Sequence, residues 1–60
     1  MTRFDWEINI ENSAAHVAEL YGSEVVASVF ARYDATCFED LCPSHYDEVF
    51  GDLLMIEDDN

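Results

Sequence analysis

The last third of the chain holds the apolar pattern that most constrains the fold. Apolar side chains recur there at the spacing i, i+3, i+4, i+7 and i+8, at Tyr46, Val49, Phe50, Leu53 and Leu54. This spacing places them along one stripe of an α-helix, which must be buried against another element. The pattern therefore predicts a helix from His45 to Ile56.

Two more apolar stripes predict two helices in the middle of the chain. The first stripe predicts a helix over Ala14–Tyr21, with Asn12 or Ser13 as its N-cap. Gly22 suits the left-handed conformation that commonly ends a helix. The second stripe predicts a helix over Val25–Tyr33. Ser23 is the expected cap of that helix, and Asp34 is expected in the left-handed conformation after it.

The segment between the second stripe and the last helix predicts one short helical turn. Thr36 and Glu39 have the spacing of a capping box, which predicts helix over Cys37–Leu41. Pro43 disfavours helical dihedral angles at Cys42 and so ends this turn. The side chains that we expect to be buried are Phe30, Phe38, Val49, Phe50 and Leu53.

The N-terminal residues show a different period. Apolar side chains alternate with polar ones over residues 4–10, at Phe4, Trp6, Ile8 and Ile10. Period two predicts an extended or strand-like arm with all four side chains on one face. Such an arm lies across the helices or pairs with its copy in a homodimer, which makes the four side chains candidate dimer or interface anchors. Helix is the alternative, because Phe4 and Ile8 are four residues apart.

Together these segments predict a mainly α, three- to four-helix single domain over residues 1–60. We expect an extended arm at 1–11, a helical core at 12–57 and a frayed tail at 58–60. Sixty residues lie near the lower limit for independent folding, so a homodimer would supply useful extra burial. Half of the residues are apolar, which argues against a disordered acidic tail.

The charge balance limits the choice of partner. Fourteen acidic residues stand against Arg3 and Arg32 alone, which gives a net charge of −12. Phosphate contacts need Lys and Arg, so we expect no direct binding to nucleic acid or to anionic membranes. A basic partner is favoured. The simpler alternative is that acidity only keeps a small protein soluble.

No targeting signal and no apolar run of membrane-spanning length is visible in the sequence. We therefore expect a cytoplasmic protein with reduced Cys37 and Cys42.

The cysteines and histidines do not form a recognisable chemical site. Cys37, Cys42 and His45, even with His16, lack the spacing of a zinc site. Cys42 with His45 lacks a third group to orient the base. The carboxylates likewise lack the pattern of a calcium loop. We expect both cysteines to be small buried side chains, and we predict no metal, no cofactor and no catalytic residue.

The acidic residues of the C-terminal half are the candidate binding residues. No Lys or Arg follows Asp34. Neighbouring carboxylates on a helix face lie about 5–6 Å apart, and one DNA strand offers a phosphate about every 3.4 Å of rise. A rigid acidic face can therefore imitate phosphates. The predicted partner-binding residues are Asp34, Glu39, Asp40, Asp47, Glu48, Asp52, Glu57 and Asp58.

In size, charge and helical character the chain resembles anti-CRISPR proteins and other DNA mimics of phages and mobile elements. Three stretches, 21–33, 38–41 and 46–50, also look like small proteins of bacterial mobile elements. This is a similarity of type over residues 20–56, and no functional residue is transferred from it. The resemblance implies a non-enzymatic inhibitor that occupies the DNA-binding groove of a defence nuclease, such as a CRISPR effector.

Two other functions remain as alternatives. The chain is also similar to helical acidic immunity proteins, which are usually longer, and this implies an antitoxin or immunity-type protein that neutralises one basic partner. The third possibility is a small adaptor that binds through its apolar N-terminal arm.

Overall fold

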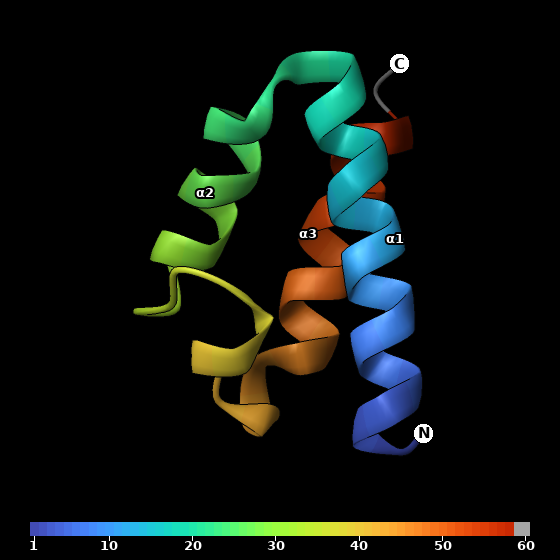
Figure 1. Cartoon of the computed structure of the whole chain (residues 1–60), viewed down its shortest axis with the longest axis vertical. Helices are drawn as coiled ribbons and strands as arrows, with labels where there is room; N and C mark the ends of the chain where they lie inside the picture. Colours follow the sequence, from blue (N-terminus) through green and yellow to red (C-terminus); the bar gives the residue numbers. More distant parts are fainter. Residues whose placement is uncertain (59–60) are drawn as a thin grey trace.

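The computed structural model describes residues 1–58, which form three α-helices and two short 3₁₀ turns (Figure 1). This confirms the mainly helical fold. None of the described helices is both long enough and apolar enough to span a membrane. Asp58 ends the last helix, and the rest of the predicted frayed tail, residues 59–60, lies outside the described residues. The elements are α1 (Arg3–Tyr21), α2 (Ser23–Ala31), η1 (Phe38–Asp40), η2 (Pro43–His45) and α3 (Tyr46–Asp58).

The prediction of an extended N-terminal arm is wrong, because α1 already begins at Arg3. Thr2 and Asp5 form a capping box: the Asp5 N–H donates to Thr2 Oγ1 at 3.1 Å, and the Thr2 N–H donates to Asp5 Oδ2 at 3.1 Å. These bonds satisfy amide groups that a helix N-terminus otherwise leaves unpaired. Asn12 and Ser13, the predicted caps, consequently lie inside α1.

The alternating apolar residues of α1 divide between two opposite faces. Residues two apart do not share a face of a helix, whereas residues four apart do. Trp6 and Ile10 form the inner pair. Ile10 is fully buried, and the Trp6 ring lies 6.0 Å from the ring of Phe50. Phe4 and Ile8 form the outer pair and are 67% and 44% exposed. The predicted single face for all four side chains is therefore wrong.

Helices α1 and α3 lie side by side and run parallel. The ring of Trp6 is 6.2 Å from that of Tyr46 near the start of both helices, and His16 Nδ1 is 3.4 Å from Glu57 Oε2 near their ends. Helix α2 runs in the opposite direction (Figure 1). Residues 32–45 then bring the chain back to the start of α3. A 19-residue helix is about 28 Å long, so α1 matches the longest dimension of the molecule, 28 Å.

Positive φ angles occur at the two predicted turn positions. Gly22 has a φ of 101° and joins α1 directly to α2. Asp34 has a φ of 59° and lies in a Schellman motif at the end of α2. In that motif the Ala35 N–H donates to the Phe30 carbonyl at 3.1 Å, and the Asp34 N–H donates to the Ala31 carbonyl at 3.2 Å. The prediction for Asp34 is confirmed. Gly22 has a positive φ, but its ψ of 153° lies outside the left-handed helical region, and Gly22 rather than Ser23 is the N-cap of α2.

The return segment is held by buried side chains at every third residue, Ala35, Phe38 and Leu41. The Phe38 ring stacks on Tyr46 with centroids 4.8 Å apart, which joins η1 to the start of α3. The predicted capping box is wrong, because the Thr36 hydroxyl donates to Asp40 and η1 starts after Cys37 without a side-chain cap.

The core lies between the three helices and the return segment. Of the five side chains predicted to be buried, Phe50 is only half-buried, because it packs at the edge against Trp6. Cys37 and Cys42 are exposed, contrary to expectation. The other four predictions are confirmed, for Phe30, Phe38, Val49 and Leu53.

Candidate functional site

Five of the eight predicted binding carboxylates come from the half of the molecule where α3 begins. The turn after α2, the η1 turn and the first turn of α3 all lie in the lower half of Figure 1. All five residues are exposed. We call them the acidic end: Asp34, Glu39, Asp40, Asp47 and Glu48.

The interactions made by the acidic end are local. Asp40 accepts a hydrogen bond from Thr36. Asp47 Oδ1 accepts one from the Glu48 N–H at 2.9 Å, and Glu48 Oε1 lies 3.2 Å from His45 Nδ1. Asp47 and Glu48 also occupy the first turn of α3, where the helix dipole favours negative charge. The helix therefore tolerates a local concentration of carboxylates.

The other three predicted carboxylates are distributed along α3. Asp52 is half-buried against α2, and Glu57 is half-buried against His16 of α1. Glu57 Oε1 is buried without a hydrogen-bond partner among residues 1–58. Asp58 is exposed but lies three helical turns, about 16 Å, from Asp47. The structure therefore does not bring all eight residues into one surface.

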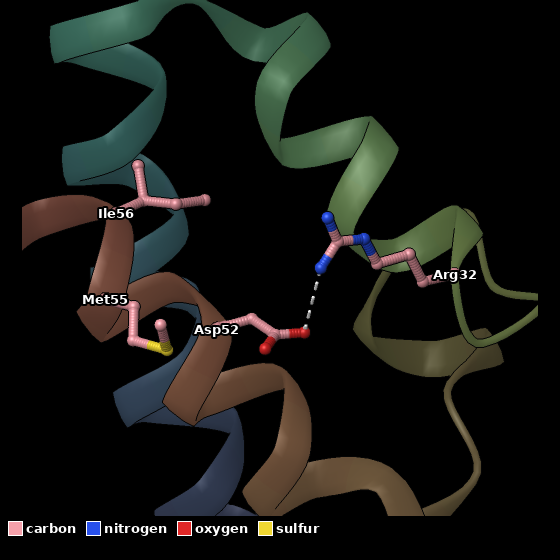
Figure 2. A pocket seen from close by; sticks show the side chains of 4 residues that line it. All are labelled: Arg32, Asp52, Met55 and Ile56. Atoms are coloured by element: carbon pink, nitrogen blue, oxygen red, sulfur yellow. Dashed lines mark ion pairs between the residues drawn. The ribbon is translucent and has the colours of Figure 1, made fainter.

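Asp52 belongs to a polar contact between α2 and α3. The Tyr33 hydroxyl donates to Asp52 Oδ2 at 2.7 Å, and Arg32 Nη1 lies 3.7 Å from the same oxygen. Figure 2 shows Arg32 reaching from the end of α2 across a pocket of about 200 Å³, which Met55 and Ile56 also line. The Asp52 carboxylate is thus engaged in contacts within the fold.

The same contact changes the acidity of Tyr33. The hydrogen bond to the Asp52 carboxylate raises the pKa of Tyr33 to about 12. Tyr33 therefore remains protonated at neutral pH and acts as a donor, not as a base. The ring of His45 lies 5.0 Å from the Tyr33 ring. The sequence places Tyr33 only in an apolar stripe, because no local pattern links it to Asp52.

Both arginines lie against groups of the fold itself. Arg3 is 5.6 Å from the centre of the Phe38 ring, and its pKa is raised mainly by a hydrogen bond with Tyr46. Arg32 contacts Asp52. Among residues 1–58, no arginine forms an ion pair with the acidic end. Glu39 is nevertheless close enough to Arg3 to contribute to the raised pKa of that arginine.

The two cysteines are separate exposed thiols. A hydrogen bond from the Ser44 side chain lowers the pKa of the Cys42 thiol, with Sγ and Oγ 3.2 Å apart. Within the described part of the chain, no group of three or more His, Cys, Asp or Glu side chains is placed to hold a metal ion.

The geometry thus places five exposed carboxylates in one half of a small helical fold, the half that also holds Arg3. Comparisons with known proteins give no match to a family model, a curated protein or a solved structure. Function is therefore inferred from the charge, burial and contacts of the residues of this chain.

Proposed function

We propose that the protein is a non-enzymatic inhibitor that binds the basic nucleic-acid-binding groove of a defence nuclease, most concretely a CRISPR effector. The acidic end makes the contact in place of DNA phosphates. The observation that supports this proposal is the group of five exposed carboxylates, without an arginine partner among residues 1–58, on a chain of net charge −12.

The physical basis is charge complementarity. A groove that binds DNA is lined by Lys and Arg, which form strong charge-assisted hydrogen bonds with carboxylates as well as with phosphates. Complementary fields also accelerate the encounter of the two proteins. The stacked Phe38 and Tyr46 rings support the acidic end, so less flexibility is lost on binding.

The test is inhibition of DNA cleavage by a panel of purified RNA-guided nucleases. We expect the protein to inhibit at least one of them, and excess target DNA to relieve the inhibition because both compete for one groove. The proposal is wrong if no nuclease in the panel is inhibited, or if inhibition does not respond to DNA.

Paired variants separate the acidic end from net charge. Glu39→Gln with Asp47→Asn removes two charges from the acidic end. Glu19→Gln with Glu24→Gln removes two exposed charges elsewhere, on α1 and α2. We expect the first pair to weaken inhibition about tenfold or more, which corresponds to roughly 1.4 kcal/mol, and the control pair to have a much smaller effect. Equal losses would show that only net charge matters.

The antitoxin or immunity-type alternative would use the same acidic surface on another basic enzyme. The adaptor alternative has an observation of its own, the exposed outer pair Phe4 and Ile8. For this alternative, Phe4→Ala with Ile8→Ala abolishes binding while the acidic-end variant binds normally. Pairing of an extended arm with a second copy loses its basis, because the backbone groups of this segment bond within α1.

A further inference from the structure

Next to the acidic end, the structure contains an open groove between α1, α2 and η1. Its volume is about 370 Å³. The α2 side consists of residues at the spacing i, i+3, i+4 and i+7, which share one helix face. These residues are Ser23, Val26, Ala27 and Phe30. Helices α1 and α2 diverge from their junction at Gly22 (Figure 1), and Phe38 of η1 also lines the groove.

The lining of the groove is mostly apolar, and its one charged residue is Glu11 of α1. Phe30 and Phe38 are core residues, 5% and 3% exposed. Ala14 and Ala27 line the groove with only a methyl group each, so space remains beside them. Glu11 is exposed and is the charged residue of the lining. An occupant that complements both features combines apolar surface with a positive charge opposite Glu11.

We propose that this groove receives a basic amphipathic helix of the partner protein, with one large apolar side chain between Ala14 and Ala27 and a Lys or Arg on Glu11. The inference rests on the proposed function in one respect, that the partner is basic. It adds a second, apolar contact beside the acidic end, since η1 contributes residues to both.

Charge and shape together select this occupant. A second copy would bring another −12 charge to an already acidic surface, which opposes self-association. The volume is near the lower end of the roughly 300–1,000 Å³ of small-molecule pockets, and Ser23, Ala27 and Cys37 at the groove are exposed. A free small molecule would keep much of its surface in water. A side chain on a helix of the partner protein is held in place by that protein, as in helix-in-groove recognition.

The two cysteines provide a footprint with an internal control, because Cys37 lines the groove and Cys42 does not. The probe is a synthetic Lys/Ala helical peptide with one central Trp, compared with the same peptide carrying Ala in that position. We expect the Trp peptide to slow alkylation of Cys37 by iodoacetamide while Cys42 reacts as before. The Ala peptide should bind about tenfold more weakly, the loss typical of removing an apolar anchor.

Two matched pairs of variants test the lining. Ala27→Phe fills the groove, whereas Ala15→Phe makes the same change at an exposed site of α1 outside it. Glu11→Gln removes the charge in the groove, whereas Glu19→Gln removes an exposed charge outside it. We expect the first member of each pair to weaken peptide binding about tenfold, and the second to leave it unchanged. The Glu11 pair still tests the groove if Ala27→Phe does not fold.

Several results would overturn the inference. These are equal protection of both cysteines, equal binding of the Trp and Ala peptides, protection of Cys37 by free indole instead of the peptide, and self-protection as the protein concentration rises.

Nuclease inhibition separates the two proposals. If Ala27→Phe inhibits like wild type while the acidic-end variant does not, the groove inference fails and the proposed function stands. If the peptide protects Cys37 but no nuclease is inhibited, the proposed function fails and the groove remains a binding site for basic helices.

Discussion

Tyr33 and Asp52 show how single residues in this protein depend on distant partners. The two side chains are nineteen positions apart in the sequence, yet the Tyr33 hydroxyl donates to Asp52 at 2.7 Å. Asp52 therefore supports the contact between α2 and α3 and differs from the exposed carboxylates around it. Its neutralisation would change the fold and the surface charge together, so it is unsuited to a test of binding.

The raised pKa of Tyr33 leads to a titration experiment. In the folded protein Tyr33 should ionise near pH 12, and Asp52→Asn should return its pKa toward the ordinary value of about 10. Asp58→Asn, at an exposed site of the same helix, is the control. The Tyr33–Asp52 hydrogen bond stabilises the folded state fully below the pKa of Tyr33 in the unfolded chain, about 10. This stabilisation is lost as pH rises from about 10 to about 12, because the unfolded state releases the Tyr33 proton first. Ultraviolet absorbance of tyrosinate measures the effect, and an identical titration of wild type and Asp52→Asn would contradict it.

Asp34 allows the cost of its backbone conformation to be measured apart from its charge. Its φ of 59° is one that glycine adopts readily and that residues with a Cβ adopt at a cost. Asp34→Gly and Asp34→Ala remove the same charge. In urea unfolding, we expect Asp34→Gly to be more stable than Asp34→Ala by about 1 kcal/mol. Equal stability would mean that residue 34 does not keep the left-handed conformation in solution.

At the scale of elements, the sequence predicts α2 and α3 well and α1 poorly. The apolar stripe in α3 is long enough to fit only a helix. The predicted bounds of this helix differ from the observed ones by one or two residues. In α1 the alternation over residues 4–10 fits a strand equally well, because two i, i+4 pairs offset by two residues look like period two. The capping box of Thr2 and Asp5 was the signal in the sequence that favours helix.

A pair of conservative variants distinguishes the two interpretations of α1. Ile10 is fully buried, whereas Ile8 is 44% exposed. Ile10→Val should lower the free energy of unfolding by about 0.5–1.5 kcal/mol, and Ile8→Val should lower it much less. Equal effects in urea unfolding would favour the single apolar face that the structure contradicts.

The candidate site was predictable only in part, because the sequence shows local patterns but not contacts between elements. The sequence shows where the carboxylates are and that Lys and Arg are missing among them. It does not show which carboxylates turn inward, because the partners of Asp52 and Glu57 lie on other helices. The groove was not foreseen either, since its lining comes from three elements that are brought together only by the fold.

For the whole molecule, net charge and small size act against stability. A charge of −12 on 60 residues produces self-repulsion that is weaker in the unfolded chain, where the charges are farther apart. We expect added sodium chloride to raise the melting temperature by screening this repulsion. The Glu19→Gln and Glu24→Gln variant should melt higher than wild type at low salt and respond less to salt. A melting temperature that falls with moderate salt would show that ion pairs outweigh repulsion.

In the proposed function, the acidic end takes the place of nucleic-acid phosphates in a basic groove. The most direct measurement is the affinity of the protein for a nuclease that it inhibits, determined over a series of salt concentrations. We expect a steep loss of affinity with salt for wild type. When Glu39 and Asp47 are neutralised, we expect weaker binding and a shallower slope, because fewer ionic contacts form. Affinity that does not change with salt, or an unchanged slope in that variant, would contradict the proposed function.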